Sequence, residues 1–258
     1  MAPRASRGKR APGAVPGPGR SSAAVSAPAV LVLAGLDPSG GAGLLADAET
    51  VRAMGAHPLC VATALTVQTT RAARRFQPVD PSLIADTMRA LLEEEDVRAI
   101  KVGMVGDAAN ARAIRALLPA GIPAVVDPVL AASSGAPLFS GPPRELLELA
   151  RGAILTPNVA EAEALLGGSA DAGKLLERGP LAVLLKGGHL AGEPVDVLAT
   201  ASGIEQFAAA RIPAEARGTG CRLASAIAAG LARGVPLRDA VIAARRHVRE
   251  YLQERVPV

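Results

Sequence analysis

One glycine turn in this sequence could hold a phosphate group. Arg217-Gly218-Thr219-Gly220-Cys221 stands at the start of an apolar helical stretch, and its glycines would allow a ligand to approach the backbone closely. The first N–H groups of a helix and its positive dipole end bind anions. Cys221 falls in the first helical turn, where the pKa of a thiol is commonly lowered, so it could take a proton from an attacking hydroxyl group. A glycine cap followed by a buried cysteine would explain the same residues equally well.

A second glycine-rich segment, Gly40-Gly41-Ala42-Gly43, follows a predicted strand and precedes a predicted helix. It could cradle a phosphate, or it could only let a substrate approach the backbone. The pattern G-x-x-x-x-G-K-[ST] is absent, which excludes an ordinary P-loop. Any transfer of a phosphoryl group must therefore use another architecture.

Thr156-Pro157-Asn158 and Glu161 place an amide and a carboxylate three residues apart on one helical face. Hard oxygen ligands of this kind can hold Mg²⁺, often through water. The same residues also suit helix capping, with Asn158 at the N-cap and Glu161 at N3, and both roles are compatible. Lys186, in Lys-Gly-Gly-His, could neutralise the phosphates of a nucleotide or could simply be solvated.

The elements that must position these residues alternate between apolar runs and helical periodicity. The predicted strands are Val30–Leu36, Leu59–Val67, Ala99–Met104, Ala124–Val129, Ala153–Thr156, Leu181–Leu185 and Val195–Ala199. The predicted helices are Leu44–Met54, Pro81–Glu94, Ala108–Leu118, Arg144–Leu149, Ala160–Leu166, Gly220–Arg233 and Leu237–Gln253. Continuous apolar strands that alternate with helices indicate an α/β fold whose largely parallel sheet is covered on both faces. In such a sheet ligands bind at the carboxyl ends of the strands, where the motifs above would meet.

The charge of the chain is unevenly distributed. The net charge is +4, but residues 1–28 are rich in Ala, Pro, Gly and Ser and carry five basic residues with no acid. Without them, 23 basic residues face 24 acidic ones, so the domain predicted at 29–258 has no excess of positive charge for nucleic acid. We expect 1–28 to be a disordered tail, because this composition cannot bury enough apolar surface to offset the entropy of ordering.

The content of hydrophobic, aromatic and cysteine residues limits the kinds of protein that this chain can be. Half of the residues are hydrophobic, yet the chain has three Phe, one Tyr and no Trp, so ligand recognition by aromatic stacking is not expected. Two cysteines, Cys60 and Cys221, suggest no disulfide framework. The sequence shows no signal peptide and no run long enough to span a membrane, so we expect a cytoplasmic protein.

Several of these segments, in this order, resemble the hydroxymethylpyrimidine/phosphomethylpyrimidine kinases of thiamine biosynthesis, a branch of the ribokinase-like superfamily. The matching segments, within roughly residues 29–254, are Ala34–Gly43, Thr63–Gln68, Lys101–Met104, Val126–Val129, Thr156–Asn158 with Glu161-Ala162, Lys186–His189 and Gly218–Cys221. The resemblance implies a three-layer α/β/α fold, ATP and Mg²⁺, and a small-molecule substrate. It also implies two successive phosphorylations, of the hydroxymethyl group and then of the monophosphate, and the family commonly forms homodimers.

The resemblance also implies roles for individual residues. Gln68 would form a hydrogen bond with the pyrimidine, while Gly35, Asp47 and Met104 would shape its pocket. Cys221 would lie nearest the reacting oxygen, and the backbone amides of Gly218, Thr219, Gly220 and Cys221 would stabilise the phosphoryl group in transfer. Thr156, Asn158 and Lys186 would bind the nucleotide, with Lys186 facing its phosphates. Asn158 and Glu161 would organise Mg²⁺.

The sequence departs from the family pattern at several positions. Arg217 stands where a histidine is common and Arg222 where a threonine is usual, so these arginines are expected to strengthen phosphate binding or alter substrate choice. Leu45 replaces a usual glutamine, and no Gly-Pro segment follows the last helix before Val258. Three alternatives stay open. They are a pyridoxal-type kinase, a non-catalytic pyrimidine-binding relative, and a dehydratase of damaged nicotinamide cofactors, which the cysteine in the turn disfavours.

Overall fold

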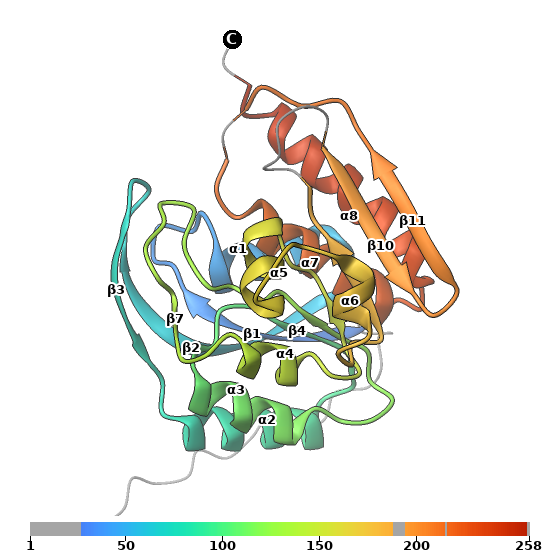
Figure 1. Ribbon diagram of the computed structural model, residues 1–258. Helices are drawn as coiled ribbons and strands as arrows, with labels where there is room; N and C mark the ends of the chain where they lie inside the picture. The colour runs from blue at the N-terminus through green and yellow to red at the C-terminus, as the bar shows by residue number, and fades with distance from the viewer. Residues whose placement is uncertain (1–26, 188–193, 215, 257–258) are drawn as a thin grey trace, which may run out of the picture.

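The computed structural model describes residues 27–187, 194–214 and 216–256, and Figure 1 shows one sheet with helices on both faces. Within these residues the large sheet has nine strands in the order β11-β10-β9-β8-β6-β4-β1-β2-β3. Pairing is parallel from β2 to β9 and antiparallel at both edges of the sheet. This arrangement confirms the predicted three-layer α/β/α fold with a mostly parallel sheet. The predicted tail at 1–28 lies almost wholly outside the described residues.

The strands of the large sheet are β1 (Ala29–Leu36), β2 (His57–Gln68), β3 (Ala73–Pro78), β4 (Val97–Val102), β6 (Ala124–Val126), β8 (Ile154–Leu155), β9 (Ala182–Leu185), β10 (Val195–Thr200) and β11 (Gly203–Ala208). The short strands β5 (Gly106–Asp107) and β7 (Phe139–Ser140) pair in parallel beside it. The helices are α1 (Gly43–Ala53), α2 (Pro81–Glu94), α3 (Ala108–Leu117), α4 (Arg144–Leu149), α5 (Val159–Leu166), α6 (Ala172–Leu176), α7 (Thr219–Ala232) and α8 (Leu237–Gln253).

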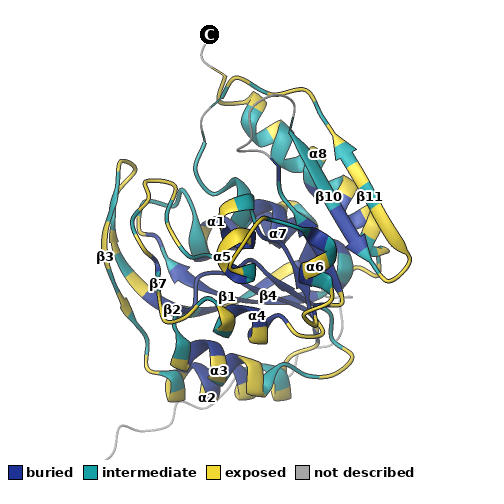
Figure 2. Ribbon diagram, in the orientation of Figure 1, coloured by how far each residue is buried: buried dark blue, intermediate teal, exposed yellow. Residues whose placement is uncertain are grey.

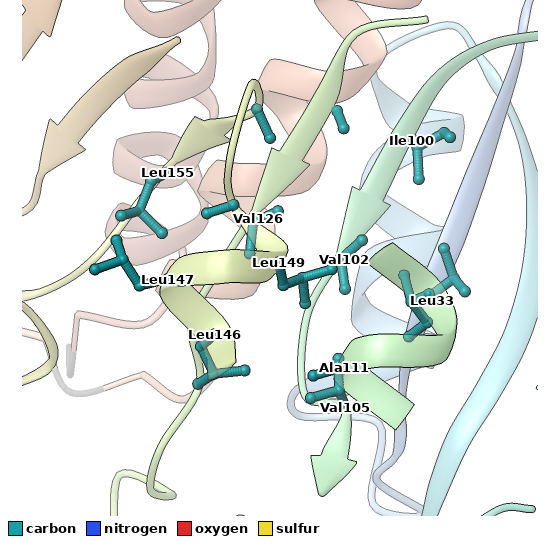
Figure 3. Packing of buried hydrophobic residues seen from close by; sticks show 14 of the residues in the cluster. Leu33, Ile100, Val102, Val105, Ala111, Val126, Leu146, Leu147, Leu149 and Leu155 are labelled. Atoms are coloured by element: carbon teal, nitrogen blue, oxygen red, sulfur yellow. The ribbon is translucent and has the colours of Figure 1, made fainter. Parts of the chain in front are cut away.

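The central strand β1 explains why the sheet is covered on both sides. Its side chains are buried alternately on two faces: Leu31 and Leu33 pack in one cluster, Val30 and Val32 in another. The first cluster includes residues of α2 to α6, and Figure 3 shows Leu33 beside side chains of α3 and α4. The second includes residues of α1, α7 and α8. In Figure 2 the central strands are the most buried part of the sheet, as a continuous apolar run requires.

Two edge strands were missed by the sequence pattern. Strand β3 carries Arg74 and Arg75, both exposed, and strand β11 alternates exposed and half-buried residues. Each has only one neighbour in the sheet, so neither needs the apolar run that marks a central strand. The short helix α6 was missed as well, and the strand predicted at Ala124–Val129 already ends at Val126.

Candidate active site

The turn before α7 lies directly against the first glycine-rich loop. Gly218 is the N-cap of α7 and has a φ of +73°, a conformation that other residues adopt only with strain. A Cβ atom at Gly218 would also overlap the carbonyl oxygen of Gly41. The two segments that the sequence singled out as phosphate-binding candidates lie far apart in the chain and are therefore brought together into one surface by the fold.

A lysine lies beside this turn. A Cβ atom added to Gly220 would be only 3.0 Å from Nζ of Lys186, so the ammonium group faces the first turn of α7. Nζ of Lys186 also donates to Oδ1 of Asp127 at 2.7 Å. Burial opposes the charge of Lys186, but the carboxylates of Asp127 and Glu161 outweigh it and raise its pKa. A fixed cation and a helix N-terminus therefore meet at one point, which makes it a candidate anion site. Of the sequence motif around Lys186, Gly188 and His189 lie outside the described residues.

The pKa of the Cys221 thiol differs from the prediction made from the sequence. Burial raises its pKa to about 11, and Asp47 and Asp127 add to that effect, although Lys101 and a hydrogen bond from Gly43 oppose it. The lowered pKa expected from the first turn of a helix was therefore wrong. Desolvation of the charged form outweighs the helix terminus. The thiol is protonated at neutral pH.

Asn158 and Glu161 form the capping box that the sequence allowed. The N–H of Glu161 donates to Oδ1 of Asn158 at 2.9 Å, and the N–H of Asn158 donates to Oε2 of Glu161 at 2.8 Å. Glu161 is buried, which raises its pKa to about 7, and it lies 3.9 Å from Nζ of Lys186. Thr156 lies fully buried just before them and donates to Asp127. Asn158 and Glu161 offer oxygen ligands next to the anion site.

Asp47 lies below the surface rather than on it. Its carboxylate has no exposed area, receives a hydrogen bond from Nζ of Lys101 at 2.5 Å, and accepts another from Oγ of Ser225 at 2.8 Å. Ser225 is one helical turn after Cys221 on α7. The predicted contribution of Asp47 to the substrate pocket is therefore indirect, through the packing of α1 and α7. The sequence motif contained Lys101, but its pairing with Asp47 was not predicted.

Gln68, Gly35 and Met104 lie around the end of β1. A Cβ atom at Gly35 would be 2.5 Å from Sδ of Met104, so the glycine makes room for that side chain. Oγ1 of Thr63 donates to the carbonyl oxygen of Met104 and fixes the backbone there. Gln68, the last residue of β2, is half-buried, and its Nε2 donates to Oδ2 of Asp37 at 3.1 Å. Asp37 was not among the predicted site residues.

The two arginines that flank the turn have partners within the protein. Arg217 donates to Oδ2 of Asp37 at 2.9 Å and is 27% exposed. Arg222 is buried, donates to Gly41 at 3.2 Å, and stacks on the ring of Tyr251 with 4.0 Å to its centroid. Arg222 therefore fastens the glycine loop to α7 and α8, which leaves it in a structural position and not a phosphate-facing one.

A groove of about 700 Å³ runs between the end of β11 and α8. Its walls include Phe207 and Ala210 on one side and Ile242, Arg245 and Arg249 on the other. The helix that forms one wall of the groove is tied to the turn, because Oη of Tyr251, the neighbour of the lining residue Glu250 on α8, donates to the carbonyl oxygen of Arg217. No sequence pattern predicted this groove, since its walls come from segments without a motif.

Within the residues that the structure describes, no three His, Cys, Asp or Glu side chains gather in a way that could hold a metal ion by themselves. No helix in the described part of the chain is long and apolar enough to cross a bilayer.

Sequence comparisons converge on one group of enzymes. The sequence profile described as phosphomethylpyrimidine kinase matches residues 37–258. A hydroxymethylpyrimidine/phosphomethylpyrimidine kinase from Rhizobium meliloti (strain 1021) is 41% identical over 236 residues, which cover 84% of this chain and 88% of that protein. The thiamine biosynthesis bifunctional protein ThiED from Geobacter sulfurreducens is 40% identical over 236 residues, 85% of this chain but 48% of that longer protein.

Solved structures agree with the sequence comparisons. The phosphomethylpyrimidine kinase from Clostridium difficile 630 matches with a TM-score of 0.74 and 32% identity, over 86% of this chain and 98% of that one. The ADP complex of Bacillus subtilis pyridoxal kinase matches with a TM-score of 0.77 and 26% identity, over 90% of this chain and 94% of that one.

Proposed function

The chain belongs to the phosphomethylpyrimidine kinase family, and we propose that it uses ATP to phosphorylate 4-amino-5-hydroxymethyl-2-methylpyrimidine and then its monophosphate, in thiamine biosynthesis. The observation that carries the proposal is the anion site at the start of α7, where Lys186 faces the Gly218–Cys221 turn. A P-loop is absent, so this site is the place for the transferring phosphoryl group. A closed set of donors that faces developing charge is what phosphoryl transfer requires.

In the proposed reaction, the hydroxymethyl oxygen of the substrate bonds to the γ-phosphorus of ATP as the bond to the leaving oxygen of ADP breaks. The first N–H groups of α7 and the ammonium group of Lys186 stabilise the negative charge of the transferring group. The proton of the hydroxyl group passes to the sulfur of Cys221 in its thiolate form, which is a minor form at neutral pH because the pKa is about 11. Gln68, Gly35 and Met104 hold the pyrimidine.

Asn158 and Glu161 are proposed to hold Mg²⁺. The donor set fits, since Mg²⁺ in phosphoryl-transfer sites usually keeps several waters and takes only one or two carboxylates in addition to substrate phosphates. Bound there, Mg²⁺ would supply positive charge that neutralises part of the charge of the nucleotide phosphates. Lys186 pairs mainly with Asp127, and the capping box engages Oε2 of Glu161, so Oε1 of Glu161 is the oxygen proposed as the Mg²⁺ ligand.

We expect Glu161→Gln to raise the Mg²⁺ concentration needed for half-maximal rate by about tenfold, because the charge is lost while an oxygen for the capping box remains. The measurement is the initial rate as a function of Mg²⁺, with a thermal melt to confirm folding. Glu163→Gln, on the exposed side of the same helix, is the control and should behave as the wild type. An unchanged Mg²⁺ requirement in Glu161→Gln would show that Glu161 only caps α5.

The groove between β11 and α8 is proposed to hold the base of ATP. Phe207 and Ile242 give it an apolar wall, and α8, which forms one side of it, is joined to the turn by the hydrogen bond from Tyr251 to Arg217. We expect Ile242→Trp to fill the groove and raise KM for ATP about tenfold, with KM for the pyrimidine nearly unchanged. Ile204→Trp, an equal substitution at an exposed position of β11 outside the groove, is the control. Equal effects of both variants on KM for ATP would show that the base of ATP does not bind in this groove.

The proposed function is tested by incubating the purified protein with ATP, Mg²⁺ and the hydroxymethylpyrimidine or its monophosphate, and following ADP release. Failure to form product at high enzyme concentration would contradict it. Pyridoxal kinase activity is the second candidate, because the ADP complex of a pyridoxal kinase is among the similar structures. The ratio of kcat/KM for the pyrimidine to that for pyridoxal decides between the two substrates.

A further inference from the structure

Gln68 is held in one orientation by a buried carboxylate. Asp37 is only 3% exposed, and its Oδ2 accepts a hydrogen bond from Nε2 of Gln68 at 3.1 Å. An ionised carboxylate can only accept hydrogen bonds, so the NH₂ half of the Gln68 amide must face it. The opposite orientation would place two oxygens against each other. The carbonyl oxygen of Gln68 is therefore the half of the amide that remains for a ligand.

Other donors keep Asp37 in place. Its Oδ1 accepts from the N–H and the hydroxyl group of Ser39 at 2.9 and 2.6 Å, and its Oδ2 accepts from the N–H of Ala42 at 3.1 Å. The guanidinium group of Arg217 donates to Oδ2 at 2.9 Å and compensates the charge. A carboxylate that is buried with this many donors has no second arrangement at similar energy.

Arg217 links the turn before α7, proposed to bind phosphate, to the end of β2, where Gln68 is proposed to bind the pyrimidine ring. Its Nη1 also donates to the carbonyl oxygen of Thr69 at 2.9 Å, and Thr69 follows Gln68 at the end of β2. Its backbone is adjacent to Gly218, the N-cap of α7. A displacement of this arginine would therefore move Asp37 and the end of β2 relative to the anion site.

The amide orientation has a chemical consequence. Within the described residues, Oε1 of Gln68 accepts no hydrogen bond, and the side chain is half-buried. An acceptor oxygen presented to a ligand favours a ring with an N–H donor and disfavours one with a carbonyl oxygen at the same point. The proposed pyrimidine carries an amino group on the ring carbon next to the hydroxymethyl carbon, which is a donor beside the reacting group.

We propose that Asp37, held by Arg217, is a specificity-determining positioning residue that fixes the carbonyl oxygen of Gln68 toward the substrate and so selects 4-aminopyrimidines over 4-oxopyrimidines. This inference rests on the proposed function. Asp37 and Arg217 act through Gln68 and are not catalytic residues. The difference between the two rings lies only at position 4, so the selection is separate from phosphoryl transfer itself.

The experiment compares 4-amino-5-hydroxymethyl-2-methylpyrimidine with its 4-oxo analogue as substrates of the wild type and of Asp37→Asn. For the wild type we expect kcat/KM to favour the amino ring by about 10- to 100-fold, the usual effect of one hydrogen bond against one unpaired acceptor. In Asp37→Asn either half of the Gln68 amide can face residue 37, so this preference should fall about tenfold while KM for ATP changes little. Arg217→Gln should lower the preference in the same direction by a smaller factor.

Asp171→Asn, at the N-cap of α6, is the control for the chemical change, because asparagine caps a helix as well as aspartate does. A ratio of kcat/KM that stays at the wild-type value in active Asp37→Asn and Arg217→Gln overturns the inference and leaves the proposed function intact. A wild type that phosphorylates neither ring overturns the proposed function, and the inference with it. Because each ratio is taken within one protein, a loss of stability in Asp37→Asn does not imitate the expected result.

Discussion

Replacing Cys221 with alanine is expected to lower kcat by about 100-fold or more, because a positioned acid–base group typically contributes 10²- to 10⁴-fold. KM for ATP should change little, since the anion site uses Lys186 and backbone N–H groups of α7, which an alanine retains. The measurement is steady-state kinetics with the pyrimidine at saturation. Cys60→Ala, at the other cysteine, is the matched control and should keep wild-type rates.

The pH dependence distinguishes proton transfer from simple packing. The pKa of Cys221 is raised to about 11, so the thiolate fraction rises about tenfold for each pH unit between pH 7 and 10. If the thiolate takes the proton, kcat/KM of the wild type for the pyrimidine rises over that range, and the rise is lost in Cys221→Ala. Cys221→Ser should resemble Cys221→Ala, because a hydroxyl group does not ionise there. Wild-type rates and an unchanged pH profile in Cys221→Ala would reduce Cys221 to a packing residue.

The sequence pattern predicted the centre of the fold better than its edges. Val30–Leu36 is apolar throughout, and Ala99–Met104 is apolar except for Lys101, because both faces of those strands are buried. The structure has strands at Ala29–Leu36 and Val97–Val102. Strands β3 and β11 are half-exposed and stand at the edges, so their sequences carry no comparable signal. In the site, likewise, interactions between residues close in the sequence were predicted, and interactions between distant residues were not.

Local side-chain interactions could be read from the sequence, and long-range ones could not. The capping box of Asn158 and Glu161 depends on a spacing of three residues, and the structure has it as expected. The partnership of Arg217 with Asp37 joins residues 180 positions apart, and no pattern in the sequence specifies it. The raised pKa of Cys221 was missed for the same reason, because it results from burial among distant elements rather than from its helix position.

Replacing Lys101 with methionine is expected to lower the free energy of unfolding by about 3–5 kcal/mol, because a buried pair that loses one partner leaves an uncompensated charge. Neither Lys101 nor Asp47 has exposed side-chain area, and their charged atoms are 2.5 Å apart. Burial opposes the charge of Lys101, yet Asp47, together with Cys221 and Asp127, outweighs it and raises the pKa of the lysine. Urea denaturation measures the loss. Lys174→Met, at an exposed position of α6, is the control and should change stability by less than about 0.5 kcal/mol.

The double variant Lys101→Met, Asp47→Asn separates the lost charge pair from lost packing. Burial raises the pKa of Asp47, and Lys101 opposes that rise, so Lys101→Met should raise it further. A folded-state pKa above the unfolded value means that stability falls as pH rises between the two. Lys101→Met should therefore be less stable at pH 8 than at pH 5 relative to the wild type.

Asparagine at 47 cannot ionise and can still accept from Ser225, so the double variant should recover more than half of the loss and show no such pH dependence. Equal stability of the single and double variants at pH 8 would mean that Lys101 contributes through its packed methylene groups and not through its charge.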